Sequence, residues 1–545
     1  NPSWGSVGYQ GRALTPPMGQ DRLTTIIPDE ANEYECDVLV IGSGAGGAVV
    51  AAELAAEGHD VIVVEKGKYF ANEDFPGTEL TGMRDMYEAR GSLATVDRGI
   101  VILAGSTLGG GTTVNWMTCL SPPESLLEEW RRDFGFEAAT SAEYANSVNY
   151  VSQRINVTEA ESAANPQNDL IERGCRELGY RCSTIPRNVS GCHRCDFCGF
   201  GCRYGAKQDT RATFLTDAAE HRARIFVQAT ALEVLQKNGV AQGARLLVTR
   251  EPGVQREVTV KAQVVVVAAG AVHTPALLMR SGLTNRNIGS NLHLHPCGAV
   301  YAAYPERMDS WLGAPQTRIC DEFADLDGNG FGVRLEASPA HPGLWALALP
   351  WRSGAHHRSV MRRLPYLANT IVLMRDRYSG QVKVDRAGKP RIHYKLHPYD
   401  VNHLSIGVEK ALRVHRAAGA SEIFGPTNEA LSFKAGSDAA FESYLKQIRD
   451  LGVRPNHFGL FCAHQMSSCR IGSGPKLGAI SPEGESFEVT NLYVADGSTL
   501  PTASGVNPMI TIMSTAHHIA QHIKSRLANV VGGTRRKSRT QRAAS

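Results

Sequence analysis

The sequence predicts an α/β protein, α+β overall, with a parallel sheet in one domain and an antiparallel sheet with helices in another. Residues 37–67 contain two short apolar runs on either side of a stretch of small residues, as in a βαβ unit. Residues 264–278 repeat an apolar run that leads into a helical segment, as another buried parallel strand would. Residues 381–394 instead alternate apolar and polar side chains about an Ala-Gly turn, which is typical of an antiparallel hairpin.

Size and charge exclude several classes of protein. The chain has 545 residues, of which 42% are hydrophobic and 20% charged, so it can bury large cores. Lys plus Arg total 57 against 54 for Asp plus Glu, and a net charge of +3 gives no field that would draw nucleic acid onto the body of the protein. We therefore expect no nucleic-acid partner.

The sequence gives little information on the cellular compartment. No stretch approaches the ~18 uninterrupted apolar residues of a membrane span, so we expect no transmembrane segment. The chain begins at Asn1 without a charged and then apolar leader, so we expect a signal peptide to be absent or already removed. The location stays unknown: a soluble, cytoplasmic protein is favoured, with peripheral membrane association as the alternative.

The βαβ segment carries a dinucleotide-binding motif. We expect a strand at 38–41, a helix at 46–57 and a second strand at 61–64, which together form a Rossmann-like unit. Gly42 permits the tight turn, Gly44 lets the backbone approach a pyrophosphate, and Gly47 lets helix and strand pack closely. Glu65 ends the second strand, where a carboxylate can accept hydrogen bonds from a ribose hydroxyl. This unit predicts a dinucleotide but does not choose between FAD and NAD.

Three further segments favour a flavin. Residues 105–116 read GSTLGGGTTVNW, a glycine-rich loop that can lie flat against a large planar ligand. Residues 264–278 read VVVVAAGAVHTPALL, a strand that leads through small residues into a helix that Pro275 can start. Residues 492–501 read LYVADGSTLP, a strand and turn that put Asp496 beside backbone donors.

At these four segments the chain resembles the glucose-methanol-choline (GMC) oxidoreductases, and the resemblance runs from about residue 34 to residue 522. Within that family it looks closest to the long-chain fatty alcohol oxidases, through GCRYGAKQ at 201–208 and AHQMSSCRIG at 463–472. The resemblance implies FAD as cofactor. It also implies oxidation of the CH-OH group of a hydrophobic alcohol, including long-chain ones, to the aldehyde or ketone, by proton abstraction and hydride transfer to flavin N5.

The resemblance also implies which residues contact FAD. The expected cofactor-binding residues are Gly42, Gly44, Gly47, Glu65, Gly105, Gly109, Gly110, Asn115, Ala231, Asp496, Gly497, Asn507 and Pro508. The chain departs from the family after the key histidine, where many relatives have Pro-Val-Gly-Thr and this chain has Gln-Met-Ser-Ser at 465–468. The loop at 465–468 is therefore expected to differ in shape from that of those relatives.

Two residues are expected to be catalytic. His464 lies in the family's catalytic position, and an imidazole that titrates near neutral pH suits the removal of a hydroxyl proton. Asn507, in SGVNPM at 504–509, matches the second position and can donate a hydrogen bond to the substrate oxygen, but it cannot act as a base. His464 is therefore expected to be the sole base. Five other histidines are expected to be packing or surface residues: His293, His295, His517, His518 and His522.

Four cysteines crowd into residues 192–202. Cys192, Cys195, Cys198 and Cys202 reproduce the spacing of a bacterial ferredoxin run, although Arg203 replaces the usual proline. They are candidate iron-sulfur ligands; zinc, disulfides and buried thiols are the competing interpretations. A cluster would favour a dehydrogenase that passes electrons to an external carrier, whereas its absence leaves oxygen as the acceptor.

Two further functions remain as alternatives to alcohol oxidation. The first is a hydroxynitrile lyase, a class that shares the fold and keeps FAD without redox turnover. The second is a flavin-binding protein without catalysis, which the presence of both His464 and Asn507 disfavours.

The expected domains are discontinuous. An N-terminal arm covers 1–33, the FAD-binding domain covers 34–120, 187–298 and 451–527, the substrate domain covers 121–186 and 299–450, and a basic disordered tail covers 528–545. We expect the hairpin at 381–394 to belong to a sheet that roofs the substrate cavity. The apolar residues at 344–351 suggest a hydrophobic substrate, although core packing explains them equally well.

Overall fold

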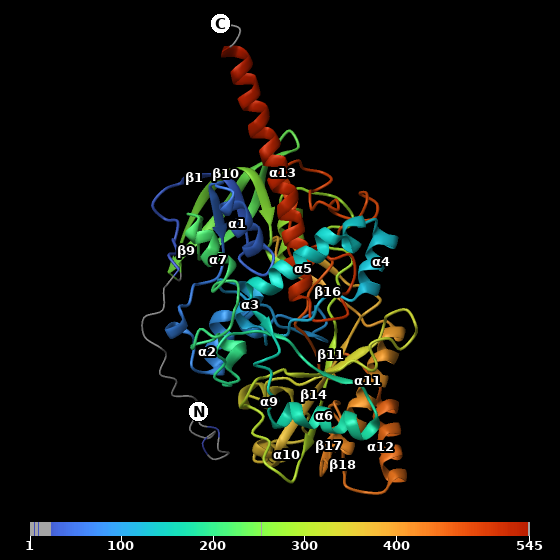
Figure 1. Ribbon diagram of the computed structural model, residues 1–545. Coiled ribbons are helices and arrows are strands. Elements are labelled where there is room, and N and C mark those ends of the chain that lie inside the picture. The colour runs from blue at the N-terminus through green and yellow to red at the C-terminus, as the bar shows by residue number, and fades with distance from the viewer. Residues whose placement is uncertain (1–4, 6–8, 10–22, 252, 543–545) are drawn as a thin grey trace.

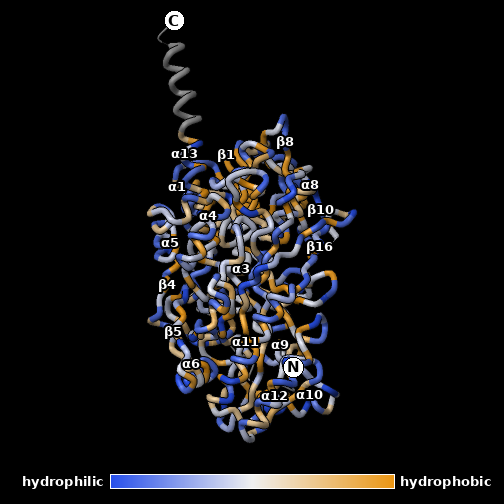
Figure 2. Tube along the Cα trace, turned by 90° about the vertical axis from the view of Figure 1, so that its right-hand side faces the viewer, coloured by the Kyte–Doolittle hydropathy of each residue, from blue (hydrophilic) through white to orange (hydrophobic). Residues whose placement is uncertain are grey.

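Two sheets stacked along the long axis of the molecule form its two halves (Figure 1). The computed structural model describes residues 5, 9, 23–251 and 253–542, with side chains described as far as residue 528. The upper half in Figure 1 holds β1, β9 and β10, and the lower half holds β11, β14, β17 and β18. Figure 2 shows the hydrophilic segments mainly in loops at the periphery of both halves.

The upper sheet has seven strands, most of them parallel. The path runs β7-β2-β1-β10-β9-β8, and β20 pairs with the end of β10. β1 pairs in parallel with β2 and β10, whereas β8, β9 and β10 form an antiparallel meander. The strands are β1 (Glu33–Ile41), β2 (Val61–Val64), β7 (Arg224–Phe226), β8 (Ala229–Lys237), β9 (Val240–Glu251), β10 (Val254–Val267) and β20 (Leu492–Val494). This parallel core confirms the Rossmann-like part of the predicted fold.

Strand alternation assigns each face of this sheet to different helices. Val38 and Val40 of β1 pack with α1 (Gly47–Ala56), α7 (Phe214–Glu220) and α13 (Met509–Arg542) in one core. Leu39 and Ile41 face the other way, into a core that contains Trp130 of α4 (Glu124–Phe134) and residues of α5 (Ala142–Arg154). Residues 124–154, which we assigned to the substrate domain, therefore pack against the parallel sheet.

Helix α8 (Gly270–Arg280) begins earlier than predicted. Pro275 lies inside the helix rather than at its start, so it cannot donate a hydrogen bond to the carbonyl of Ala271 four residues before it. The hydroxyl of Ser468 donates to that carbonyl instead, over 2.6 Å. The helix tolerates the proline because a distant loop supplies the missing donor.

The lower sheet has nine strands and is mainly antiparallel. The path runs β18-β17-β11-β14-β13-β12-β5, with β19 on β11 and β3 on β19. Its strands are β3 (Val101–Ile102), β5 (Cys182–Thr184), β11 (Cys297–Ala303), β12 (Arg318–Cys320), β13 (Val333–Glu336), β14 (Leu367–Met374), β17 (Glu422–Phe424), β18 (Ser432–Lys434) and β19 (Leu460–Cys462). This sheet confirms the second part of the predicted fold class.

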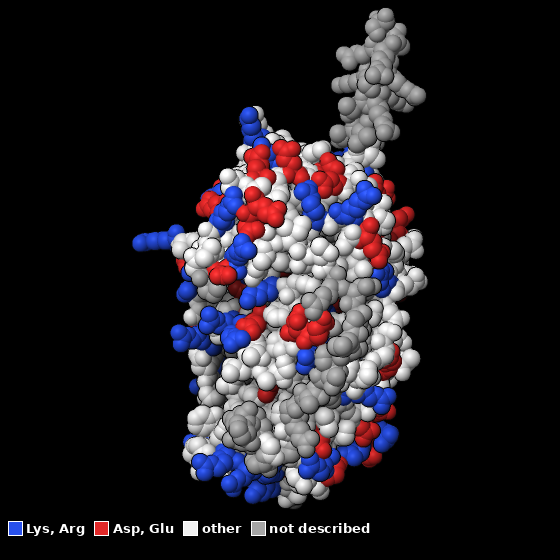
Figure 3. Space-filling view, turned by 90° about the vertical axis from the view of Figure 1, so that its left-hand side faces the viewer, with Lys and Arg blue, Asp and Glu red and all other residues white. Residues whose placement is uncertain are grey.

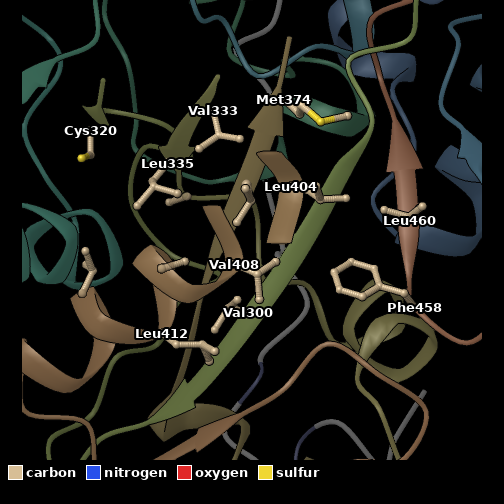
Figure 4. Close-up of a cluster of buried hydrophobic side chains, with 14 of the residues drawn as sticks. Val300, Cys320, Val333, Leu335, Met374, Leu404, Val408, Leu412, Phe458 and Leu460 are labelled. Carbon is tan, nitrogen blue, oxygen red and sulfur yellow. The ribbon is translucent and has the colours of Figure 1, made fainter. Parts of the chain in front are cut away.

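Helix α11 (Pro398–Ala417) covers one face of the lower sheet. Leu404, Val408 and Leu412 recur at helical spacing and point onto Val300 and Val333 of the sheet (Figure 4). Helices α6 (Pro166–Leu178) and α12 (Asp438–Leu451) contribute to the same core. These three helices therefore pack on the face of the lower sheet that is turned away from the upper half.

The hairpin at 381–394 forms, but it does not roof the cavity. β15 (Gln381–Val384) and β16 (Pro390–His393) pair only with each other, as a separate two-stranded sheet. Val382 and Ile392 are buried because both strands pack beside α8, so none of the hairpin lies in the cavity wall. The predicted roof was wrong, and the nine-stranded sheet takes that place.

The remaining elements are short, apart from the last helix. They are α2 (Glu79–Met86), α3 (Gly110–Val114), α9 (Pro342–Ala348), α10 (Gly354–Met361), β4 (Val157–Thr158) and β6 (Arg187–Asn188). α9 covers most of the apolar segment 344–351, and that segment does not line the cavity. α13 continues as far as Arg542, so the tail predicted to be disordered is helical over 528–542. Residues 543–545 lie outside the described part.

Charged side chains of both signs lie on the surface of the molecule. On the face shown in Figure 3, acidic and basic side chains are interspersed over the half that contains the parallel sheet. Among the described residues, no helix combines the length and the apolar character needed to cross a membrane.

Candidate functional site

A cavity of about 330 Å³ lies where the two sheets meet. The upper sheet contributes the carboxyl ends of its parallel strands, at Ile41 and Val64, which is where open α/β sheets bind ligands. The lower sheet contributes Cys297 of β11, Leu373 of β14 and Phe461 of β19. The cavity therefore has two chemically different ends.

Backbone groups dominate the end that faces the parallel sheet. The turn after β1 contains Gly42, Ser43 and Gly44, and it leads into the N-terminus of α1, where free N–H groups favour an anionic ligand. The hydroxyl of Ser43 donates to Glu65 Oε2 over 2.6 Å and accepts from the N–H of Gly109 over 2.9 Å. Ser43 thus ties both glycine-rich loops to the acid at the end of β2.

The glycines of this turn meet different surroundings. A Cβ built on Gly44 meets no protein atom within 4 Å, so the space beside it is open and belongs to the cavity wall. A Cβ on Gly46 would lie 1.8 Å from the carbonyl oxygen of Ala495, and one on Gly47 would lie 2.0 Å from that of Gly42. Gly46 and Gly47 are needed for packing, whereas Gly44 leaves room for a ligand that approaches the backbone.

Most of the residues predicted to contact the cofactor line this cavity. Those in its wall are Gly42, Gly44, Glu65, Gly105, Gly110, Asn115, Ala231, Asp496, Gly497, Asn507 and Pro508. Gly47 and Gly109 lie just behind the wall, Gly47 at the contact between helix and strand, and Gly109 in a left-handed turn with φ of 84°. Four distant segments of the chain thus meet around one space.

Asp496 is held in place by donors on both carboxylate oxygens. The N–H of Ser498 donates to Oδ1 over 2.7 Å, and the N–H of Gly270 donates to Oδ2 over 2.8 Å. Burial nevertheless raises the pKa of this carboxyl above its ordinary value. The predicted position of Asp496 beside backbone donors agrees with the structure.

A charged cluster that the sequence did not predict lies in the cavity wall. Lys66 follows Glu65, and its ammonium forms an ion pair with Glu88 and lies 3.1 Å from Nε2 of His273 on α8. Burial lowers the pKa of His273, and the charge of Lys66 lowers it further. No local pattern indicated this cluster, because its members come from three separate segments.

His464 lies at the other end of the cavity. It follows β19, and its ring Nδ1 is 3.2 Å from Nδ1 of His295. His295 is fully buried, and its Nε2 accepts a hydrogen bond from the N–H of Gly505 over 3.0 Å. Burial lowers the pKa of His464 to about 4. His295 is buried, as expected of a packing residue, and its ring in addition contacts the predicted catalytic histidine.

Asn507 forms a hydrogen bond with a buried carboxyl group. Its Nδ2 donates to Glu336 Oε2 over 3.4 Å, and Nε2 of Gln316 donates to the same oxygen over 2.9 Å. Thr118 donates in turn to Gln316 Oε1 over 2.6 Å, and all four residues line the cavity. Burial raises the pKa of Glu336 to about 7.

Sequence reasoning missed Glu336 and Gln316 because they lie in segments without a motif. Glu336 is simply the last residue of β13, and Gln316 lies between strands. An acid at the end of a short alternating strand, VRLE at 333–336, was the sole local signal.

Between the two ends, the cavity wall is apolar. Side chains from loops of the upper half and strands of the lower half contribute to it, and a partly buried aromatic side chain lies on each side. The apolar residues are Leu93, Leu103, Val114, Trp116, Ile371, Leu373 and Phe461. Such a wall suits an apolar ligand and excludes water from the space between His464 and the glycine-rich turn.

The four clustered cysteines are not assembled as a metal site. Within the described ranges, no three His, Cys, Asp or Glu side chains are grouped so that they could hold a metal ion. Cys195 packs with Phe75, Phe197 and Phe200, whereas the other three cysteines pack around Met117 and Val189. All four are free thiols outside the cavity wall. The structure therefore gives the iron-sulfur prediction no support: Cys195 packs in one apolar cluster and the other three cysteines pack in another.

A buried lysine links the cysteine segment to the loop that lines the cavity. Lys207 is fully buried, and its ammonium donates to the carbonyls of Thr113 (2.9 Å), Asn115 (2.7 Å) and Cys198 (2.9 Å). Its three N–H groups are thereby all satisfied. These hydrogen bonds fix the loop that contains Asn115, and Asn115 lines the cavity.

Comparisons with known proteins agree with this arrangement. Family models described as GMC oxidoreductase match residues 83–297 and 376–516, and one described as FAD binding domain matches residues 37–73. The long-chain-alcohol oxidase FAO3 of Arabidopsis thaliana is 36% identical over 514 residues, covering 91% of this chain and 68% of that protein. The 6'''-hydroxyparomomycin C oxidase of Streptomyces lividus is 25% identical over 560 residues, covering 94% and 95%.

Solved structures share the fold. A formate oxidase of Aspergillus oryzae superposes with a TM-score of 0.69 at 15% identity, covering 92% of this chain and 100% of that one. A pyridoxine 4-oxidase superposes with a TM-score of 0.65 at 15% identity, covering 89% and 99%. At such identity the likeness concerns the fold alone.

Proposed function

The chain belongs to the glucose-methanol-choline family of FAD-dependent oxidoreductases, and from this premise we propose that it oxidises a hydrophobic alcohol to the aldehyde or ketone. One observation carries the proposal. A single cavity joins the glycine-rich turn to His464 and Asn507 through an apolar wall. The named Arabidopsis relatives act on long-chain alcohols, and the apolar wall supports the same class of substrate here.

The residues around the glycine-rich turn suit FAD. The open space at Gly44 and the N–H groups at the start of α1 would hold the diphosphate, and Glu65, oriented by Ser43, would accept from a ribose hydroxyl. Gly105, Gly110 and the loop before Asn115 would line the flavin. When bound, FAD accepts the hydride from the alcohol carbon.

The residues at the other end hold the reacting oxygen. We assign His464 and Asn507 to contact the hydroxyl of the alcohol, because both line the cavity and each has hydrogen-bonding atoms left over. A donor aimed at this oxygen stabilises the negative charge that develops as the proton leaves. The apolar wall strengthens such hydrogen bonds by keeping water out.

Molecular oxygen is the proposed electron acceptor. The relatives at 34–36% identity are named as alcohol oxidases, and the described residues contain no metal site that would relay electrons outward. An external carrier would make the protein a dehydrogenase instead. A non-redox lyase on the same fold is the remaining alternative.

Anaerobic reduction of the flavin tests this proposal. Purified holoenzyme is mixed, without oxygen, with aliphatic alcohols of increasing chain length, an aromatic alcohol and a sterol, and the flavin absorbance is followed. We expect long aliphatic alcohols to bleach the flavin fastest, and added oxygen to restore the colour with release of hydrogen peroxide. Failure of every alcohol to bleach the flavin would contradict the proposal and favour the lyase.

A further inference from the structure

The histidine pair forms a hydrogen-bond chain with a fixed direction. The N–H of Gly505 can only donate, so Nε2 of His295 must accept and carries no proton. Burial and the neighbouring His464 lower the pKa of His295 well below its ordinary value, so the ring is neutral. A neutral imidazole without a proton on Nε2 carries it on Nδ1.

The same reasoning determines which ring nitrogen of His464 carries the proton. The Nδ1–H of His295 donates to Nδ1 of His464 over 3.2 Å, so that nitrogen is an acceptor. Since His464 is also neutral at pH 7, its proton resides on Nε2. Nε2 has no hydrogen-bond partner among the described residues, and His464 lines the cavity, so an N–H is available to a ligand there. A nitrogen that already carries a proton cannot accept another one.

A second group in the cavity is arranged as an acceptor. Both donors to Glu336, Gln316 and Asn507, use Oε2, and Oε1 has no partner among the described residues although it is buried. A buried carboxylate oxygen without a donor is costly unless a ligand donates to it. An alcohol hydroxyl is such a donor.

From these contacts we infer that His295 is a positioning residue that holds His464 as a hydrogen-bond donor to the substrate oxygen, and that Glu336 receives the hydroxyl proton. This inference rests on the proposed alcohol oxidation. The O–H bond of the alcohol breaks and its proton forms a bond with Glu336 Oε1, while the hydride leaves the same carbinol carbon with its electron pair for FAD. The C=O bond forms, and His464 keeps its own proton throughout.

Nuclear magnetic resonance of the histidine rings tests the first half directly. Holoenzyme labelled with ¹⁵N-histidine gives separate signals for protonated and unprotonated ring nitrogens, and His464→Gln identifies the signals of residue 464. We expect Nε2 protonated and Nδ1 unprotonated at pH 7. A proton on Nδ1, or on both nitrogens, overturns the inference.

Two variants of nearly equal shape sharpen this test. His295→Gln can accept from Gly505 and donate to His464, so we expect the wild-type protonation and flavin-reduction rates within about threefold of wild type. His295→Glu can only accept when ionised, so it should move the proton of His464 to Nδ1 and slow flavin reduction at least tenfold. Equal spectra for the two variants overturn the inference. If His295→Glu does not fold, the wild-type spectrum still decides.

The pH dependence of flavin reduction tests the second half. The charged and titratable groups recorded around Glu336 are Arg334 on its own strand and Cys297 on β11, whose thiol pKa is itself raised by burial, so neither titrates near neutral pH. With the pKa of Glu336 raised to about 7, the carboxylate that accepts a proton accumulates above that pH. The anaerobic reduction rate should therefore rise about tenfold from pH 6 to pH 8.

Glu336→Gln removes the acceptor but keeps the shape of the side chain. We expect a slower rate that no longer rises between pH 6 and pH 8, with FAD content unchanged. A rise that persists in this variant overturns the role of Glu336. If no alcohol reduces the flavin of the wild type, the proposed function fails, whereas the ring protonation of His464 is still measured independently.

Discussion

The two ends of the cavity are built on different principles. Around Gly44 the wall is mostly backbone, and side chains such as Ser43 and Glu65 orient that backbone. Around His464 the wall consists of buried titratable side chains with pKa values displaced by burial. The first end suits a ligand that approaches the backbone, because glycine lacks a side chain. The second end suits chemistry that depends on the protonation state of buried side chains. The comparison teaches that binding and chemistry can be altered separately.

The largest expected effect comes from removing the imidazole at the reacting end. We predict that His464→Ala lowers the rate of flavin reduction by alcohol about 10²–10⁴-fold, the usual range for a group that handles a proton or hydrogen bond in the transition state. The FAD content should match the wild type, because the other end is untouched. Rapid mixing without oxygen measures the rate, and absorbance measures the content. Parallel loss of FAD would show that the two ends are not independent.

Lys207 connects the cysteine segment to the flavin-side loop, and its removal should act on stability. We predict that Lys207→Met lowers the free energy of unfolding by about 2–4 kcal/mol, because three buried carbonyls lose their donor. Urea unfolding of the holoenzyme measures this. Lys383→Met, at an exposed position of β15, is the matched control and should change little. Equal stability of both variants would contradict the bridging role.

A pair of glycine substitutions separates space for a ligand from space needed for packing. Gly44→Val adds a side chain where no protein atom lies within 4 Å, so the apoprotein should fold normally while FAD binds at least tenfold more weakly, about 1.4 kcal/mol. Gly46→Ala would meet the carbonyl of Ala495 at 1.8 Å and should lower the melting temperature even without FAD. Titration of the apoprotein with FAD and thermal unfolding distinguish the two. If Gly44→Val binds FAD as wild type does, the diphosphate does not lie there.

The smallest effect is expected from a substitution that lies outside both ends of the cavity. Cys192 is partly exposed, and its sulfur accepts from the N–H of Arg194 over 3.4 Å, a contact that a serine hydroxyl can replace. Cys192→Ser should therefore change stability by less than about 0.5 kcal/mol and leave flavin reduction unchanged. Iron analysis of both proteins gives the matching measurement. Stoichiometric iron that disappears in the variant would restore the cluster that the structure does not assemble.

The sequence predicted the βαβ unit well because its signals are local. The spacing of Gly42, Gly44 and Gly47, with Glu65 after the second strand, lies within one βαβ unit, and the strands at 61–64 and 492–494 formed as expected. The family resemblance located His464 and Asn507. It could not reveal the partners of these residues, because Glu336 and His295 reach them through pairing of strands far apart in the chain.

The errors had the same origin. The hairpin at 381–394 was correctly recognised from its alternation, but alternation does not say which neighbour a hairpin packs against. The cysteine spacing matched a cluster motif, yet the turn of residues 197–200 sends the thiols into two apolar clusters. Segment 121–186 lacked a nucleotide motif, although α4 and α5 pack on the parallel sheet through Trp130 and Tyr144.

The bond from Ser468 to the carbonyl left free by Pro275 joins the two ends mechanically. α8 contributes residues to the cavity wall, and Ser468 belongs to the loop that carries His464. A ligand that orders α8 is therefore expected to order this loop as well, even though single side chains at either end can be replaced separately. If the cofactor raises the affinity for a substrate analogue that orders the loop, the analogue should raise the affinity for the cofactor by the same factor.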